Sequence, residues 1–180
     1  MLDLTLLPDG ASVFVDTNIF YLHFQLRSLT CINFFSRVEN GEIDAYVNIQ
    51  ILSDLLHKLM IAEAFNKHCT TSSRPSASKL KEYLNRHRGT PIPLGEYQTQ
   101  FENAVAIGLK VLPINEKLLV ETKIERTTYY LMTGDSLHLG CMNRRTVKRK
   151  KAPLRDIVTY DGDFAHIPGV TVWTPQDVIP

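Results

Sequence analysis

Acidic side chains at the ends of expected structural elements are the best candidates for chemistry in this sequence. Asp16 directly follows the apolar run SVFV, and Asp161 follows the apolar segment DIVTY and opens the turn Asp-Gly-Asp that contains Asp163. Asp135 stands at the start of an expected helix. Each has an ordinary explanation when taken alone, because aspartate is common at helix N-caps and in Asp-Gly turns. Their collective placement is what suggests a site.

Several carboxylates crowded at one place repel one another, which raises their pKa values and destabilises the fold. A hard cation such as Mg²⁺ or Mn²⁺ removes that penalty, because it prefers carboxylate and water oxygens as ligands. Two such ions roughly 4 Å apart can activate a water and stabilise the leaving oxygen of a phosphodiester. The residues therefore favour metal-dependent phosphodiester hydrolysis.

Asp54 is a less certain member of this set. It lies on the expected helix 49–66, opposite the centre of the apolar arc and close to His57 and Lys58. An ion pair between Asp54 and Lys58, four residues apart on a solvated face, explains it without any catalytic role. Both interpretations stay open at this point.

The elements that would position these acids alternate between strand and helix. Strands are expected at 12–15, 45–47, 156–160 and 170–173, and VLPI at 111–114 is a further apolar segment. Helices are expected from Ile19, from Ile49 to about Asn66, over 79–88, over 96–109 and from about Asp135. Such alternation predicts right-handed crossovers and a mostly parallel sheet with helices on both faces. Ligands of these folds gather at the carboxyl ends of the strands, where Asp16 and Asp161 stand.

Length and composition limit the class of protein. The 180 residues fit one domain, with 44% hydrophobic and 22% charged residues. No apolar run approaches the roughly 20 residues of a membrane span, and the N-terminal MLDLTLLPDG lacks the basic region of a signal peptide. The three cysteines, Cys31, Cys69 and Cys141, are odd in number and far apart. We therefore expect a cytoplasmic protein without a disulfide framework or a zinc site.

The formal net charge is only +1, but its distribution is uneven. A basic run free of acids comprises Arg144, Arg145, Lys148, Arg149, Lys150, Lys151 and Arg155. Such a run is either a solvated loop or, if it lies beside a site that handles phosphate, a surface that holds a nucleic-acid backbone.

Four segments carry a resemblance to a known family. They are VFVDTNIF at 13–20, ILSDLLHKL at 51–59, GDSLHLGCM at 134–142 and IVTYDGDF at 157–164, followed by IPGVTVWTP at 167–175. In order and character they resemble the PIN-domain nucleases, which include the VapC-like toxin ribonucleases. The resemblance implies a three-layer α/β/α sandwich formed by residues 1–180 as a single domain, with an insertion at about 66–95. It also implies an endoribonuclease that hydrolyses RNA with a water activated by carboxylate-bound Mg²⁺ or Mn²⁺.

The family's functional residues can be carried over by position. Asp16, Asp135 and Asp161 resemble the metal ligands, with Asp163 as an adjacent acid, and Thr17 and Asn18 would orient Asp16. Asp54, the fourth catalytic acid with Asp16, Asp135 and Asp161, occupies a place where the family more often has glutamate. The basic residues expected to hold RNA are Arg144, Arg145, Lys148, Arg149, Lys150 and Lys151. Toxin-like members act with a cognate inhibitor and self-associate, so an antitoxin and a homodimer are implied partners.

Other functions remain to be weighed. A PIN-like module that lacks activity and only binds RNA or a protein is the main alternative, because Asp54 departs from the family. A phosphatase with an aspartyl nucleophile is disfavoured, since Asn18 stands where such enzymes have a second aspartate. Metal-free cleavage by His57, His138 or His166 is the third alternative, and His138 lies one helical turn from Asp135, within hydrogen-bond reach.

Overall fold

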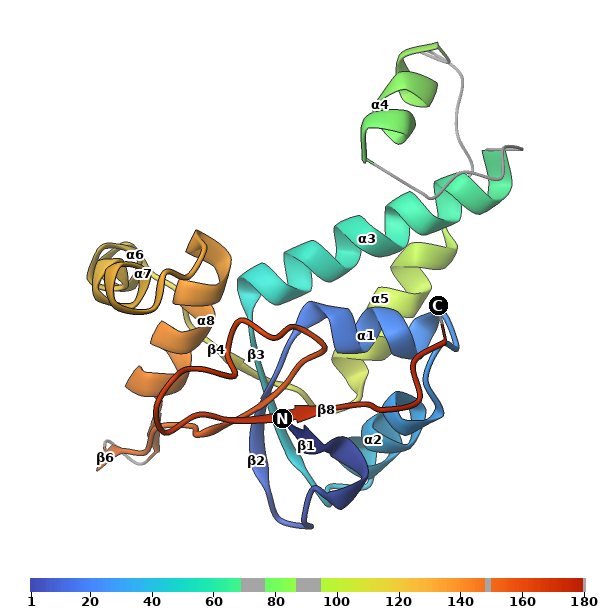
Figure 1. Ribbon diagram of the computed structural model, residues 1–180. Helices are drawn as coiled ribbons and strands as arrows, with labels where there is room; N and C mark the ends of the chain where they lie inside the picture. Colours follow the sequence, from blue (N-terminus) through green and yellow to red (C-terminus); the bar gives the residue numbers. More distant parts are fainter. Residues whose placement is uncertain (69–76, 87–94, 148–149, 180) are drawn as a thin grey trace.

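The computed structural model describes residues 1–68, 77–86, 95–147 and 150–179. Its main sheet has six parallel strands in the order β1-β8-β7-β2-β3-β4 (Figure 1). These strands are β1 (Leu2–Asp3), β2 (Ser12–Val15), β3 (Asp44–Asn48), β4 (Lys110–Leu112), β7 (Asp156–Val158) and β8 (Thr171–Thr174). The short strands β5 (Thr146–Val147) and β6 (Lys150–Lys151) form a separate antiparallel hairpin.

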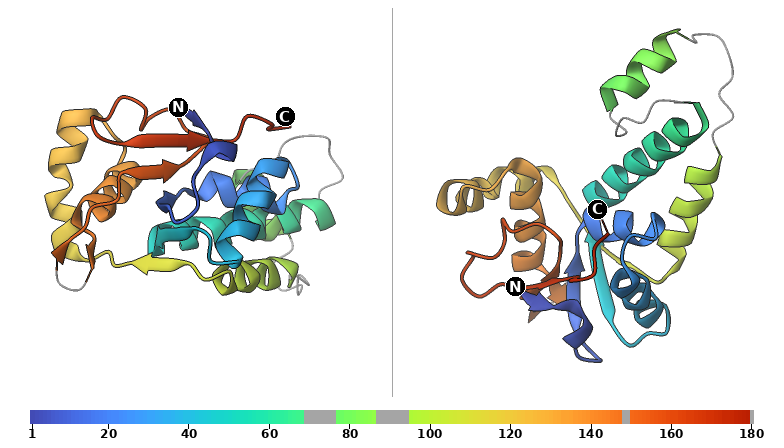
Figure 2. Two further views of the ribbon diagram at one scale, coloured as in Figure 1. Left: turned by 90° about the horizontal axis from the view of Figure 1, so that it is seen from below. Right: turned by 45° about the vertical axis from the view of Figure 1, so that its right-hand side comes forward.

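Helices cover both faces of this sheet, which confirms the predicted α/β/α sandwich (Figures 1 and 2). α3 packs against α1 and α5 and α1 packs against α2 on one side, while α8 packs against α6 and α7 on the other. The helices are α1 (Thr17–Phe24), α2 (Leu29–Glu39), α3 (Ile49–His68), α4 (Ala77–Arg86), α5 (Glu96–Ala106), α6 (Glu116–Glu121), α7 (Lys123–Tyr129) and α8 (Thr133–Arg144), with the 3-10 turn η1 (Leu4–Leu6).

The central strand β2 has an unusual position in the connectivity. It pairs with β3, the next main strand along the chain, on one side and with the much later β7 on the other. The chain crosses from β2 to β3 on one side and from β7 to β8 on the other. These opposite directions open a crevice at the carboxyl ends of β2 and β7. In open α/β sheets this crevice is the usual place for a ligand.

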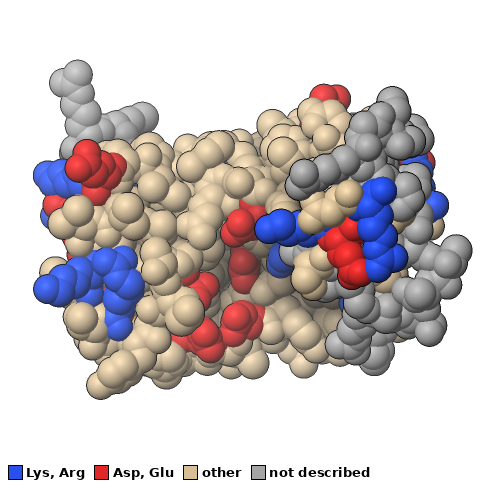
Figure 3. Space-filling view, turned by 90° about the horizontal axis from the view of Figure 1, so that it is seen from above, with Lys and Arg blue, Asp and Glu red and all other residues tan. Residues whose placement is uncertain are grey.

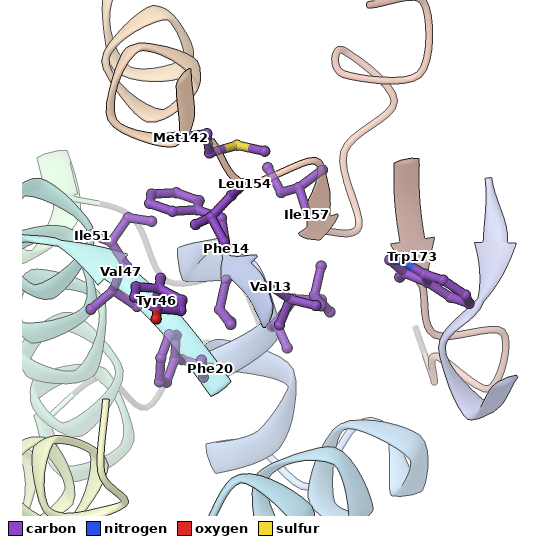
Figure 4. Close-up of a cluster of buried hydrophobic side chains, with 14 of the residues drawn as sticks. Val13, Phe14, Phe20, Tyr46, Val47, Ile51, Met142, Leu154, Ile157 and Trp173 are labelled. Carbon is purple, nitrogen blue, oxygen red and sulfur yellow. The ribbon is translucent and has the colours of Figure 1, made fainter. Parts of the chain in front are cut away.

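The core forms on both faces of β2, as its unbroken apolar sequence predicts. Val13, Phe14 and Val15 are completely buried. Figure 4 shows Phe14 pointing toward Met142 of α8 and Leu154. The sheet and both helical layers are thus joined through side chains that immediately precede Asp16, and this fixes the backbone from which Asp16 emerges.

A buried carboxylate, Glu63, connects α3 with the start of α5, on either side of the segment 66–95 that was predicted to be an insertion. Glu63 of α3 accepts hydrogen bonds from the backbone N–H groups of Gly95 (2.9 Å) and Tyr97 (2.7 Å) and forms an ion pair with Lys67 (2.8 Å). Burial alone raises the pKa of Glu63, but these donors lower it to about 2. The start of α5 is thereby held against α3, while α4 stands away from the sheet (Figures 1 and 2).

Some elements differ from their predicted bounds. The helix expected over 96–109 ends at Ala106, because Gly108 adopts a positive φ of 98°. α8 begins at Thr133, slightly before Asp135. β1 and the β5–β6 hairpin were not predicted, since strands of two residues carry no readable alternation.

Two of the three cysteines, Cys31 and Cys141, are free and buried, and Cys69 lies outside the described residues. Within the part of the chain that the structure describes, the helices are too short or too polar to cross a membrane.

α8 approaches α6 and α7 closely at Gly140. A Cβ on Gly140 would overlap the methyl group of Thr122 and would also lie 3.2 Å from Leu118 Cδ1. Both neighbours are buried, so they have little room to move.

We therefore predict that Gly140→Ala lowers the free energy of unfolding by about 1–3 kcal/mol, the usual penalty for overpacking. Urea unfolding followed by circular dichroism measures this change. Gly162→Ala is the matched control, because nothing lies within 4 Å of its Cβ position. Equal midpoints for the two variants would contradict the tight packing of α8 at this glycine.

Candidate functional site

Asp16 is held by hydrogen bonds to both of its carboxylate oxygens. Oδ1 accepts from the backbone N–H of Thr17 (2.6 Å), so Asp16 is the N-cap of α1. Oδ2 accepts from the Asn18 amide (2.7 Å) and from the Thr159 hydroxyl (2.7 Å). Asn18 thus orients Asp16 as the resemblance implied, whereas Thr17 does so through its backbone and not its hydroxyl.

Thr159 connects Asp16 with the loop that follows β7. Its hydroxyl donates to Asp16 and accepts from the backbone N–H of Asp161 (2.9 Å) and from the Asn18 amide (3.2 Å). Asn18 Oδ1 in turn accepts from the backbone N–H of Tyr160 (3.0 Å). A hydroxyl offers one donor and two acceptor positions, and all three are used here. The network therefore fixes the loop relative to Asp16 without any bound ligand.

Asp161 and Asp163 lie in the turn that this network anchors. Asp161 Oδ1 accepts from the backbone N–H of Asp163 (3.0 Å), and both side chains are exposed. Phe164, the next residue, is completely buried and holds the turn against the core. The predicted Asp-Gly-Asp turn is therefore present and presents two carboxylates to solvent.

Asp135 faces the same region from α8. Burial raises the pKa of its carboxyl to about 6, and the negative charges of Asp16, Asp161 and Asp163 act in the same direction. This is the expected result of several like charges around a half-buried acid. Asp135, Asp16, Asp161 and Asp163 are hereafter called the carboxylate cluster.

A close contact between Gly134 and Gln50 brings the N-terminal end of α8 against α3. A Cβ on Gly134 would lie 3.1 Å from the amide nitrogen of Gln50, so the glycine allows the start of α8 to approach α3. Gln50 Oε1 is buried without a hydrogen-bond partner among the described residues. An oxygen acceptor with no donor thus lies near Asp135.

His138 is engaged with Asn48 and not with Asp135. Asn48 Oδ1 accepts from the backbone N–H of Ile51 (3.0 Å), so its amide nitrogen faces His138 Nδ1 (3.0 Å) and donates to it. The imidazole proton is therefore on Nε2. Burial lowers the pKa of His138, against the opposing effect of the charges of Asp16 and Asp54. A buried neutral imidazole is a poor candidate for metal-free acid–base cleavage.

Asp54 lies at the margin of the carboxylate cluster. Its charge acts on His138 together with that of Asp16, but it is not among the charges that raise the pKa of Asp135. Asp54 is exposed on α3 and forms no ion pair with Lys58, although both residues are described. The ion pair suggested by the sequence is thus not formed, and a catalytic role for Asp54 stays a prediction.

Acidic side chains gather in a hollow across the middle of the face shown in Figure 3, with basic side chains at both ends of that face. Within the described ranges, no group of three Asp, Glu, His or Cys side chains is arranged closely enough to hold a metal ion. The carboxylate cluster thus shares one electrostatic environment, but its side chains do not already converge on a single point.

Arg144 and Arg145 make contacts within the domain. The basic run in the sequence had predicted that both bind RNA. Arg144 donates to Glu121 (3.2 Å) and Glu125 (2.8 Å). The Arg145 guanidinium lies 4.4 Å from the ring centroid of Tyr46 and donates to its hydroxyl (2.6 Å). These contacts join α8 to α6, α7 and β3 and leave both side chains partly buried.

Lys150 and Lys151, the described lysines of the basic run, lie away from the carboxylate cluster. Lys150 and Lys151 form β6, and Lys148 and Arg149 lie outside the described residues. This segment follows the C-terminal end of α8 and leads into the amino end of β7, whereas Asp135 lies in the first turn of α8 (Figure 1). These two lysines and Asp135 therefore lie at opposite ends of α8.

The sequence did not single out Thr159, Gln50 or Asn48. Thr159 could have been found, since it follows Val158 in the same register as Asp16 follows Val15, and these two valines are paired. Gln50 and Asn48 gave no signal, because an amide at the start of a helix is explained by capping alone.

Comparisons with known proteins identify the fold. No family model matches the sequence, and no curated protein sequence matches it. A chain in the crystal structure of VapBC2 from Rickettsia felis bound to a DNA fragment from their promoter is similar, with a TM-score of 0.53 and 13% identity. The match covers 91% of this chain and 98% of that chain. This likeness concerns the fold alone, and the protein has a PIN-like fold.

The raised pKa of Asp135 predicts a pH-dependent effect on stability. The native state binds this proton more tightly than the unfolded chain, whose aspartates titrate near 3.9. The parent therefore loses stability as the pH rises from about 4 to about 6, whereas Asp135→Asn does not. Without divalent metal, we expect the variant to be more stable than the parent by about 1 kcal/mol at pH 7.5, after allowance for solvent screening of a half-exposed group.

This difference should shrink toward zero at about pH 3, where the carboxyl is mostly protonated in both states. Urea unfolding in chelator at the two pH values measures it. A difference that is the same at both pH values would show that repulsion at Asp135 is not its source.

Proposed function

We propose that this protein is a divalent-metal-dependent endoribonuclease that hydrolyses RNA phosphodiesters at the carboxylate cluster. The observation that carries the proposal is that Asp16 and Asp161 meet at the carboxyl ends of the neighbouring strands β2 and β7, where Thr159 bonds to both, with Asp135 facing them from α8. A protein that only stacked helices on a sheet would gain nothing from this arrangement, because like charges destabilise it.

The donor chemistry fits Mg²⁺ or Mn²⁺, since the cluster offers carboxylate oxygens and neither thiolate nor free imidazole. Asp16, Asp135 and Asp161 would hold the metal, with Asp163 beside them. When bound, the metal would offset the carboxylate charge, activate a water for attack on phosphorus and stabilise the departing 3′-oxygen. The Gln50 amide, which contacts Gly134 next to Asp135, has an oxygen that is buried without a partner among the described residues.

The protein's own side chains would act mainly by orientation. Thr159 and Asn18 hold one oxygen of Asp16 in place (2.7 Å each), and Thr17 N–H holds the other (2.6 Å). The loss of groups that orient a metal ligand in this way lowers metal affinity or activity. Asp54, at the margin of the cluster, would act through a water and not by direct contact.

The biological setting is proposed by similarity to VapBC2. That assembly is bound to a DNA fragment from its promoter. We propose for this chain a toxin-like role in the cytoplasm, with RNA as substrate, an antitoxin protein as partner and self-association into a homodimer.

A second candidate function is a PIN-like module that binds RNA or protein without cleaving it. Two observations favour it: Asp54 stands in place of glutamate, and no three described metal-ligating side chains already converge. The next experiment separates these functions.

We expect the purified protein to cleave a mixed RNA pool in Mn²⁺ or Mg²⁺ and to stop in excess chelator. The products should carry 5′-phosphate and 3′-hydroxyl ends, because a water attacks phosphorus without help from the 2′-hydroxyl. Asp16→Asn should lower the rate at least about 100-fold while the protein stays folded. End-group analysis by mass spectrometry distinguishes the outcomes: cyclic phosphates formed in chelator would mean imidazole chemistry, and no cleavage would favour the inactive module.

Thr159 provides a matched pair of variants. Thr159→Val keeps the shape but removes the donor to Asp16, so we expect activity or Mn²⁺ affinity to fall about 10- to 100-fold. Thr159→Ser keeps the hydroxyl and should retain most activity. Rates measured on one RNA at several Mn²⁺ concentrations test this, and equal losses in both variants would exclude the hydroxyl as the orienting group.

A further inference from the structure

Three large side chains are exposed around the carboxylate cluster. Tyr160 follows β7 and is 54% exposed, while Tyr130 and Met132 precede α8 and are 90% and 74% exposed. Single exposed apolar residues are ordinary on protein surfaces and indicate no function by themselves. These differ in that they come from two loops that both end at the carboxylate cluster.

Tyr160 is held rigidly by the residues that orient Asp16. Its backbone N–H donates to Asn18 Oδ1 (3.0 Å), and it lies between Thr159, which donates to Asp16, and Asp161. Its backbone therefore cannot move independently of the cluster. The side chain nevertheless stays exposed and does not pack into the core.

Tyr130 is fixed in a comparable way on the other loop. It lies between the buried Leu131 and Tyr129, whose carbonyl oxygen contacts His166 Nε2 (3.2 Å) in the loop that contains Asp161 and Asp163. Tyr130 has a positive φ of 58°, but Leu26 at the end of α1 has a φ of 53° and is 74% exposed. The positive φ alone therefore indicates no function. The position of Tyr130 in the loop before α8 is what distinguishes it from Leu26.

Exposed rings beside the carboxylate cluster can attract an RNA strand in a way that does not depend on charge. Lys150 and Lys151 of the basic run follow the C-terminal end of α8, whereas Asp135 lies in its first turn. Stacking of bases on aromatic rings is independent of charge and tolerates any sequence. It requires bases that are free of pairing partners, so that they can turn toward the protein.

We infer that Tyr160 and Tyr130 are substrate-binding residues that stack unpaired bases on either side of the phosphate presented to the carboxylate cluster. This inference rests on the proposed function and adds to it the residues that hold the bases. The two tyrosines reach the site from different loops, so together they would define the path of the strand across the crevice.

The test is binding of a fluorescein-labelled, unstructured 12-nucleotide RNA, measured by anisotropy in an Asp16→Asn background to prevent cleavage. Tyr160→Ala and Tyr130→Ala should each weaken binding about 5- to 100-fold. Tyr→Phe at either position should restore it, because the ring and not the hydroxyl is used. Leu26→Ala is the matched control for exposure and backbone conformation, and it should leave affinity unchanged.

A second series replaces single nucleotides of the same RNA by abasic sites. At one position the abasic RNA should bind more weakly than the intact RNA to the protein with Tyr160, but equally to the Tyr160→Ala variant. The same RNA annealed into a duplex should bind more weakly than the single strand.

If the wild-type protein cleaves RNA but the alanine variants bind it as tightly as Leu26→Ala does, the stacking inference fails and the nuclease stands. Duplex bound as tightly as single strand would also overturn it. If the wild-type protein neither binds nor cleaves RNA, the proposed function fails and this inference with it.

Discussion

Because β2 and β7 are parallel neighbours with Val15 opposite Val158, Asp16 and Thr159 emerge side by side at the carboxyl edge of the sheet. The remaining geometry of the cluster follows from this register. Thr159 donates to Asp16 and accepts from Asp161 N–H, and Asn18 reaches from α1 to both Asp16 and Tyr160 N–H. A slip of one residue in the β2–β7 pairing would turn Thr159 away from Asp16 and break the hydrogen bonds that link the two strand ends. The sheet thus sets the position of the acids more than any local preference does.

This arrangement places negative charges where they oppose folding. Asp135 is brought against Asp16, Asp161 and Asp163 by the packing of α8, which Gly134 and Gly140 allow at two points along the helix. The buried apolar residues of β2 and α8 supply the stability that the charges subtract. A cation that binds the native state would stabilise it by mass action and so offset the destabilisation caused by the carboxylates. Strain concentrated at a site and compensated by the surrounding core is common where a protein binds a ligand.

Much of the fold could be predicted from the sequence, because its signals are local. The apolar SVFV before Asp16 predicted β2 at its observed bounds, and helical spacing from Ile49 predicted most of α3. The hydrogen-bond partners of Asp16 were only partly predictable, since Asn18 is adjacent in sequence but Thr159 is brought by strand pairing. The basic run was misjudged for the same reason. Its charge is visible in the sequence, but its placement at the far end of α8 and the ion pairs of Arg144 depend on tertiary packing.

The central claim is that crowding of carboxylates around Asp135 prepares the site for a divalent cation. Isothermal titration with Mn²⁺ at pH 6, repeated in buffers of different ionisation enthalpy, measures the protons released on binding. With the pKa of Asp135 raised to about 6, we predict release of roughly half a proton per site at pH 6 and almost none at pH 8. Asp135→Asn should bind Mn²⁺ more weakly and release fewer protons at pH 6. Absence of Mn²⁺ binding to the wild-type protein, or proton release unchanged in Asp135→Asn, would contradict the claim.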